Sequence, residues 1–391
     1  MRPAAQPALI AGEFCAPCLL PCVERDTGDA CTSGRGARYG VHPANPEVFW
    51  PWLEWASGPA PVADARPLPQ LPAHIAVMKK ELTAADVREL PSTAIGFTIS
   101  EFLGVASRAE RAGTTVREVL GASGRRIIVI GADEDETNVV RWQDWGRVRA
   151  RLVRHTPDLI VPPDLSIYDD EEPATAMAHF FAHTTMTADI SREGIPSVAP
   201  FGYARASDIE RFAAWANENE VRGAFLDLQN RQPEKVLEIV DDLRRVRHLF
   251  PMPFTWIVHG LAQPPLWRAL HEALGAVVFS GSGAWEEARL RRRFVTEGDR
   301  LVREGSDLPF RELLATNVEA LQTAASRVLP LAPRSKAPAA QQTELFGDAA
   351  RQGTSRAIYH RRTRNRETDR RRALTGPNQL IPKVARERAD P

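Results

Sequence analysis

Short apolar runs alternate with amphipathic stretches along residues 75–328. The run Arg125-Arg-Ile-Ile-Val-Ile-Gly131 is apolar between a basic entry and a glycine exit, which is typical of a strand buried on both faces. We expect six such strands, at 125–131, 158–162, 197–201, 223–228, 254–258 and 276–279. Weaker candidates at 75–78 and 93–98 would raise the number to eight.

The stretches between these strands show helical spacing of their apolar residues. Helices are expected at 84–89, 100–111, 114–120, 139–154, 173–193, 206–219, 233–247, 264–274, 284–293 and 308–327. Because two parallel strands need a long crossover between them, this alternation predicts an α/β fold, a parallel (β/α) repeat. Eight strands suit a barrel and six suit an open doubly wound sheet. No GxGxxG fingerprint of a dinucleotide-binding sheet occurs, which favours the barrel-like arrangement.

The regions on both sides of this repeat differ from it in composition. Residues 57–74 are rich in proline and alanine and predict a semi-extended linker. Residues 329–391 begin with a Pro/Ala-rich stretch, become rich in arginine, and are expected to be disordered. We therefore expect a four-cysteine module with a Trp-rich segment at 1–56, a linker at 57–74, the parallel α/β domain at 75–328 and a basic tail at 329–391.

All four cysteines of the chain lie near its N-terminus with the spacing C-x2-C-x3-C-x8-C: Cys15, Cys18, Cys22 and Cys31. Thiolates at this spacing are able to surround one ion, so we expect a zinc site or an iron–sulfur cluster. Ligand softness admits both. The alternative is a set of free or disulfide-paired thiols, and a reducing cytoplasm disfavours disulfides.

The net charge of zero for the 391 residues conceals a division between body and tail. Residues 334–391 hold 14 Lys/Arg and 6 Asp/Glu, so the rest of the chain is acidic. A basic tail predicts DNA or RNA as its partner, through sequence-independent phosphate contacts; the alternative is a solvated tail. The candidate contacts are Arg361, Arg362, Arg364, Arg366, Arg370, Arg371 and Arg372. Because no apolar run has the length of a membrane span or of a secretion signal, we expect a cytoplasmic protein without a membrane partner.

The tail also carries a short peptide of recognisable form. The segment Gln342-Thr-Glu-Leu-Phe346 resembles the Q-x-x-L-F peptide by which bacterial DNA-processing proteins dock on the replication sliding clamp. This resemblance implies that Gln342, Leu345 and Phe346 contact the clamp, with Leu345 and Phe346 filling an apolar groove. The alternative is a small amphipathic segment that docks back on the body.

Polar and acidic residues follow the predicted strands, where a parallel α/β fold places its ligand site. Carboxylates from three strands and a histidine from a fourth suit acid–base chemistry or a divalent metal. The candidate catalytic residues are Asp133, Asp135, Asp164, Tyr168, Asp170, Asp227 and His259. Asp227 ends an otherwise apolar strand, so its charge must be paired, coordinated or neutralised there.

Two more ordinary interpretations compete with this site. Loops are polar in general, and Asp, Ser and Asn also cap the helices that follow strands. His179 and His183 stand four residues apart in an expected helix, which would place them on one face as metal ligands. No glutamate follows His179 to complete H-E-x-x-H, and an exposed helix face is the commoner explanation.

The segment Pro163-Asp-Leu-Ser-Ile-Tyr-Asp-Asp170, followed by Gly194-Ile-Pro-Ser-Val-Ala-Pro200, is similar to a family of uncharacterised bacterial and phage- or mobile-element-associated proteins. Its core pattern is P-[DN]-F-S-[LI]-[YF]-x-D, and the similar region spans about 125–283. Leu165 stands where the pattern has an aromatic residue. The resemblance implies a parallel α/β core and a mobile-element setting, and it assigns no reaction and no site residue.

Two classes of function follow from the sequence. The first is an enzyme on nucleic acid or nucleotides, whose acidic strand-end pocket performs the chemistry. The second is a non-catalytic, DNA-associated adaptor whose tail recruits the sliding clamp. A small-molecule enzyme with an unrelated tail is a third alternative.

Overall fold

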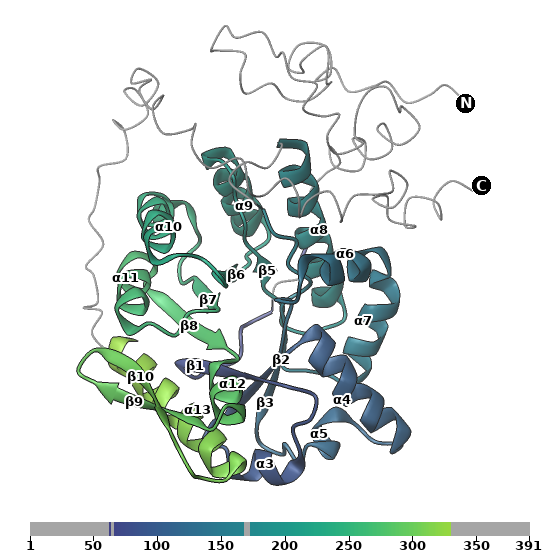
Figure 1. Ribbon diagram of the computed structural model, residues 1–391. Coiled ribbons are helices and arrows are strands. Elements are labelled where there is room, and N and C mark those ends of the chain that lie inside the picture. The colour runs from purple at the N-terminus through teal and green to yellow at the C-terminus, as the bar shows by residue number, and fades with distance from the viewer. Residues whose placement is uncertain (1–61, 64–65, 168–172, 330–391) are drawn as a thin grey trace, which may run out of the picture. The chain divides into compact units, whose positions relative to one another are not determined.

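The computed structural model describes residues 62–63, 66–167 and 173–329, and an eight-stranded parallel sheet forms their centre (Figure 1). The strands are β1 (His74–Met78), β2 (Ala94–Thr98), β3 (Arg126–Ile130), β4 (Leu159–Ile160), β5 (Ala199–Pro200), β6 (Gly223–Asp227), β7 (Thr255–His259) and β8 (Ala276–Gly281). Their order is β4-β3-β2-β1-β8-β7-β6-β5, so the first strand of the chain pairs with the last. The sheet curls into a half-barrel, and an isolated parallel bridge between Ile160 and Ser197 links its two edges.

Helices alternate with these strands and surround the sheet in Figure 1. They are α3 (Ala84–Glu89), α4 (Ile99–Arg111), α5 (Val116–Val119), α6 (Asp135–Gln143), α7 (Trp145–Arg154), α8 (Pro173–Arg192), α9 (Ala206–Glu218), α10 (Pro233–Val246), α11 (Pro264–Leu274), α12 (Gly283–Arg289) and α13 (Phe310–Val328). A single 3-10 turn, Arg247–Leu249, follows α10. The predicted α/β class and parallel (β/α) repeat are thereby confirmed.

The strands of the large sheet are mostly apolar because each of its faces lies against a separate core. Along β3, Ile127 and Val129 pack with the surrounding helices, whereas Ile128 and Ile130 belong to an inner cluster. This two-residue alternation is the ordinary geometry of a strand. The inner cluster draws on every strand or its flank: Ile75, Val77, Ala94, Ile128, Ile130, Ala132, Leu159, Val161, Val198, Phe225, Ile257 and Val278. Side chains thus fill the inside of the curled sheet, as they do in (β/α) barrels.

Residues before β1 also contribute to this inner core. Leu68 and Leu71, which lie in the segment predicted as a linker, are partly buried against the inner cluster. Ala63 is buried, and its N–H donates to Asn219 Oδ1 over 2.8 Å. The described part of this segment therefore covers one end of the sheet.

Two of the predicted helices were wrong in extent. The helix expected at 284–293 ends at Arg289, and an antiparallel hairpin follows, with strands β9 (Arg292–Glu297) and β10 (Arg300–Gly305). Gly298 has a φ of 57° in its two-residue turn, a conformation that suits glycine. The helix expected at 139–154 is instead two helices, α6 and α7, which meet at Asp144.

None of the helices in the described ranges has both the length and the apolar character that a membrane crossing requires.

Candidate functional site

Three neighbouring strands end with polar side chains in register. Asp227 is the last residue of β6 and pairs across the sheet with His259, the last residue of β7. His259 pairs in turn with Ser280 of β8. Each of the three lies two residues after an inner-cluster side chain, namely Phe225, Ile257 or Val278. Since side chains alternate along a strand, all three belong to the inner face at the carboxyl end of the sheet.

His259 is held as a buried, neutral imidazole. It is 1% exposed, and its Nδ1 lies 2.9 Å from Ser280 Oγ. Burial lowers the pKa of His259, while the charges of Asp227 and Asp133 act in the opposite direction. The Ser280 hydroxyl also lies 3.4 Å from Val258 O, which only accepts. A hydroxyl that donates to this carbonyl accepts from Nδ1–H, and His259 then keeps a basic lone pair on Nε2.

Asp227 is a carboxyl group whose surroundings oppose its charge. Burial raises its pKa, and the nearby His259 and the Gln229 N–H partly offset this rise. The N–H of Gln229 donates to Asp227 Oδ1 over 2.8 Å. The sequence expectation that this carboxylate needs a partner or a proton therefore agrees with its position beside His259.

Asp164 lies just past β4 and is the most strongly perturbed carboxyl group of the site. Burial raises its pKa well above the ordinary value, the charges of Asp227 and Asp135 raise it further, and Arg231 opposes them. Its Oδ1 is 3.6 Å from His183 Nε2. That nitrogen already accepts the N–H of Leu165 over 2.8 Å, so His183 offers no proton to the carboxylate there. The surroundings of Asp164 therefore favour its protonated form.

The backbone around Asp164 is fixed from two sides. The side-chain amide of Asn138 in α6 donates to Gly131 O, Asp133 O and Asp164 O, at 2.9, 3.1 and 2.8 Å. On the other side, His183 of α8 accepts from Leu165, and Ser166 Oγ donates to Asp135 Oδ1 over 2.7 Å. The loop that presents Asp164 is thus preorganised by α6 and α8 together.

His179 and His183 contradict the expectation of an exposed helix face. His183 is 1% exposed, and Nδ1 of His179 is buried without a hydrogen-bond partner among the described residues. Burial lowers the pKa of His179 to about 4 and lowers that of His183 well below its ordinary value. The sequence held a sign of this burial, because alanines and phenylalanines flank the two histidines in Ala-Met-Ala-His179-Phe-Phe-Ala-His183.

Two of the predicted acids are near the site but already engaged. Asp133 forms an ion pair with the buried Arg141, and Arg141 also donates to Ser100 Oγ. The Oδ2 of Asp133 accepts in addition from Ser100 N over 3.2 Å. Asp135 accepts the hydroxyl of Ser166. Their charges reach the other site residues, since Asp133 acts on His259 and Asp135 on Asp164 and Asp227. Both acids therefore shape the field of the site while holding its loops.

The remaining predicted residues lie outside the described ranges. They are Tyr168, Asp170, Cys15, Cys18, Cys22, Cys31, Gln342, Leu345, Phe346, Arg361, Arg362, Arg364, Arg366, Arg370, Arg371 and Arg372. Among the residues that the structure does describe, no three His, Cys, Asp or Glu side chains form a group that could hold a metal ion. The divalent metal, the zinc or iron–sulfur site, the nucleic-acid contacts and the clamp peptide stay predictions.

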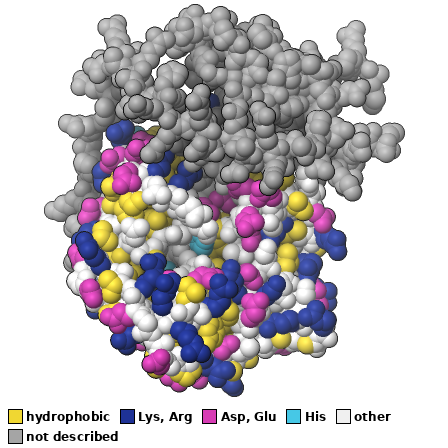
Figure 2. Space-filling view, in the orientation of Figure 1, with side chains coloured by type: hydrophobic (Ala, Val, Ile, Leu, Met, Phe, Trp, Pro, Cys, Tyr) yellow, Lys and Arg dark blue, Asp and Glu magenta, His cyan; other side chains and the backbone are white. Residues whose placement is uncertain are grey.

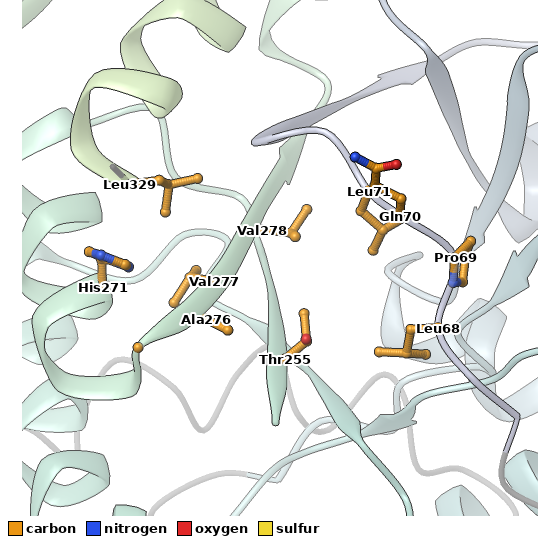
Figure 3. A pocket seen from close by; sticks show the side chains of 11 residues that line it. Leu68, Pro69, Gln70, Leu71, Thr255, His271, Ala276, Val277, Val278 and Leu329 are labelled. Atoms are coloured by element: carbon orange, nitrogen blue, oxygen red, sulfur yellow. The ribbon is translucent and has the colours of Figure 1, made fainter. Parts of the chain in front are cut away.

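A cavity of about 380 Å³ lies at the other end of the strands, where β7 and β8 begin. Figure 3 shows Val277 and Val278 of β8 between Leu329 on one side and the segment of Leu68 and Leu71 on the other. Its lining is largely apolar and contains no carboxylate. This cavity is therefore separate from the acidic site at the carboxyl end. Figure 2 shows acidic and basic side chains gathered around a histidine on the face in view.

Comparison with protein-family models and with curated proteins finds no match for this chain.

Proposed function

We propose that the protein is an enzyme that performs general acid–base chemistry on a nucleic acid or a nucleotide. One observation carries this proposal: Asp164, Asp227 and His259 stand at the ends of three different strands, and Asp227 acts on the ionisation of both Asp164 and His259 at the carboxyl end of the sheet. Groups of low exposure whose pKa values are shifted in opposite directions, raised for the aspartates and lowered for the histidine, are characteristic of acid–base sites.

The three groups have complementary roles. Asp164 retains a proton near neutral pH and serves as the general acid for a leaving atom. His259, neutral and oriented by Ser280, takes a proton from the attacking group through Nε2. Asp227 lies beside His259 and stabilises the imidazolium that forms, as a carboxylate does in hydrolytic triads. Only proton transfer is assigned to these residues.

Nucleic acid or a nucleotide is proposed as substrate because of the parts of the chain outside the sheet. The basic tail is suited to phosphate contacts, and the four-cysteine pattern to a small metal-bound module. The resemblance to mobile-element-associated proteins and the clamp-like peptide favour a DNA setting. A second candidate function is the adaptor, which rests on Gln342, Leu345 and Phe346 and needs no chemistry at the sheet.

The test uses the purified full chain and its Asp227→Asn and His259→Gln variants. Each is incubated with the common ribo- and deoxyribonucleotides and with single- and double-stranded DNA and RNA oligonucleotides, and products are identified by mass spectrometry. We expect wild-type turnover of one substrate and a loss of about 10²- to 10⁴-fold in each variant. The matched control is Asp158→Asn, which removes one carboxylate at the opposite end of β4.

Two results separate the enzyme from the adaptor. Unchanged biological activity in Asp227→Asn and His259→Gln, together with its loss on deletion of 334–391, rules out the enzyme and supports the adaptor. Loss of activity in both site variants, with the tail intact, rules out the adaptor as the whole function.

A further inference from the structure

Arg231 is a cation in the acidic site that has no counterion in contact with it among the residues the structure describes. It lies in the turn that follows β6, four residues after Asp227, and is partly buried. Its charge is close enough to lower the pKa of both Asp164 and Asp227. Within the described part of the chain, however, its guanidinium forms no hydrogen bond and no ion pair with either carboxyl group.

The turn that carries Arg231 is fixed to the end of β7. Leu228 N donates to His259 O over 3.0 Å, and Arg231 N donates to Leu228 O over 3.3 Å. Asn230, at a φ of 58°, turns the chain just before Arg231. Gly260 packs so closely on Gln229 that a Cβ there would lie 2.4 Å from Gln229 Cγ. The backbone of Arg231 is therefore held in a set position relative to the strand that presents His259.

Half-buried arginines without a contacting counterion also occur elsewhere in the described residues, but Arg126 and Arg222 lie at the amino ends of β3 and β6. Several other arginines are paired. Arg141 contacts Asp133, Arg117 contacts Asp158 at 2.7 Å, and Arg211 contacts Asp208 at 3.1 Å. A guanidinium presents five N–H donors and stays charged, and those of Arg231 are not buried, so they stay open to an incoming acceptor. An arginine kept in this condition beside candidate catalytic groups is suited to an acceptor that arrives with the ligand.

We propose that Arg231 binds an anionic group of the substrate, a phosphate, and thereby places the reacting atoms between Asp164 and His259. This inference rests on the proposed function and specifies the part of the substrate that the site recognises. Arginine binds phosphate through two parallel N–H···O hydrogen bonds, which fix orientation as well as charge. A protonated Asp164 does not repel such an anion, and its hydroxyl is able to donate to a phosphate or leaving-group oxygen.

Phosphate binding at Arg231 has a proton linkage that a surface contact would lack. A bound anion near Asp164 and Asp227 favours their protonated forms, because like charges oppose ionisation. Ligand binding should therefore draw protons into the site above the pH at which these groups begin to ionise. The measured binding enthalpy would then depend on the ionisation enthalpy of the buffer.

The test is calorimetric titration of the folded full chain with inorganic phosphate, AMP and adenosine in two buffers of different ionisation enthalpy. We expect phosphate and AMP to bind with proton uptake and adenosine to bind far more weakly. Arg231→Gln should weaken AMP binding by about 10- to 100-fold, as expected for loss of charged hydrogen bonds, and should remove the buffer dependence. Arg231→Lys should lie between, since lysine keeps the charge without the bidentate geometry.

Arg244→Gln is the matched control, because Arg244 is an exposed arginine of α10 that pairs with Asp241 at 2.7 Å. It should bind AMP as the wild type does. Circular dichroism and the thermal midpoint establish that each variant is folded, and Arg231→Lys carries the test if Arg231→Gln is not.

Three results would overturn the inference: wild-type binding of neither phosphate nor AMP, equal AMP affinity in Arg231→Gln and the wild type, or equal affinity for adenosine and AMP. The proposed function is judged separately by turnover in Asp227→Asn and His259→Gln. Phosphate binding that depends on Arg231, with full turnover in those two variants, would refute the proposed chemistry and leave the anion site standing.

Discussion

Asp158 and Asp164 stand at the two ends of the same short strand, β4, and their surroundings are opposite. Asp158 accepts from Arg117 and from the backbone N–H of Ile127, both at 2.7 Å. Asp164 is buried, lies near two other carboxyl groups and has a pKa raised well above its ordinary value. The carboxylate of Asp158 thus receives two hydrogen bonds, whereas the carboxyl group of Asp164 lies in surroundings that oppose its charge.

This difference assigns Asp158 to the stability of the fold and Asp164 to the candidate site, although both belong to one βα unit. The amino end of a strand in a parallel fold contributes mainly to stability, and the carboxyl end carries the site. Withholding partners from a buried acid costs free energy, and such costs concentrate where chemistry needs a perturbed group. The paired Asp158 and the unpaired Asp164 are therefore expected to respond in opposite ways to the same substitution.

The largest expected difference is in catalysis. Asp164→Asn removes the proton that the proposed acid donates and should lower turnover by about 10²- to 10⁴-fold. Asp158→Asn should leave turnover within about twofold of the wild type, because surface changes away from the site have small effects. Steady-state rates on the substrate found in the turnover screen measure both. Equal losses of turnover in the two variants would show that Asp164 has no catalytic role beyond that of Asp158.

The second difference concerns pH and the buried histidines. His179 of the site has a folded-state pKa of about 4, below the ordinary value of 6.5. The unfolded chain therefore takes up this proton first, so the stability from His179 is complete above pH 6.5 and is lost as pH falls toward 4. Asp164 and Asp227, whose folded pKa values are raised, act in the opposite sense, since their stability is lost as pH rises.

Urea unfolding at several pH values between 7 and 4.5 measures this balance. Four histidines whose pKa values are lowered by loss of solvation, His74, His179, His183 and His259, outnumber the two raised acids. The free energy of unfolding should therefore fall on acidification, and His179→Gln should reduce the slope by about 1.4 kcal/mol per pH unit between pH 6 and 4.5. An unchanged slope in that variant would mean that His179 is not buried in its neutral form.

The third difference is the stability of the paired end. Asp158→Asn keeps the shape of the side chain but removes the charge that holds Arg117 and Ile127 N. Because both partners in the ion pair are about one-third exposed, the expected loss is about 1 kcal/mol rather than the larger value of a buried pair. Thermal or urea unfolding at pH 7 measures it. A double-mutant cycle with Arg117→Gln should show that the two losses are not additive.

The smallest expected effect is a gain at the carboxyl end. Asp164→Asn removes a buried group that resists ionisation, so the variant should be more stable by about 1 kcal/mol at pH 8. The gain should fade toward pH 4, where the unfolded carboxyl group is protonated as well. The same unfolding measurements across pH test it. A loss of stability at pH 8 would indicate that the carboxylate of Asp164 is satisfied in the folded protein.

Much of the fold followed from the spacing of apolar residues. The helix expected at 84–89 and that at 264–274 occur at those residues, and the run at 125–131 contains β3. The β9–β10 hairpin was missed, although Gly298-Asp299 stands between two alternating runs and is a recognisable turn signal. Basic residues that dominate 289–293 suited a helix end equally well, and the burial of Phe294 with its N–H donated to Asn317 Oδ1 of α13 favours the strand.

The candidate site was predicted in part for a simple topological reason. Parallel strands all end at the same edge, so Asp164, Asp227 and His259 could be expected together once the strands were located. The pairing of Asp133 with Arg141 was not predictable, because it depends on how α6 crosses the loop after β3. The burial of His183 and the isolation of Arg231 depend likewise on the neighbouring loops and helices, which the local sequence does not specify.

Periodicity and residue type along the chain are enough to establish a parallel α/β repeat with acids and a histidine at the strand ends. Periodicity relates residues two to four positions apart, and these spacings determine which side chains share a face of a strand or helix. Tertiary packing decides which of those acids is paired and which keeps its proton. A pKa and an ion pair depend on atoms brought together from distant segments. Before β4, Asp158 contacts Arg117 of α5, and after β4 the loop of Asp164 contacts His183 of α8. At this protein's strand ends, the chain supplies the groups, and their folded surroundings determine what each can do.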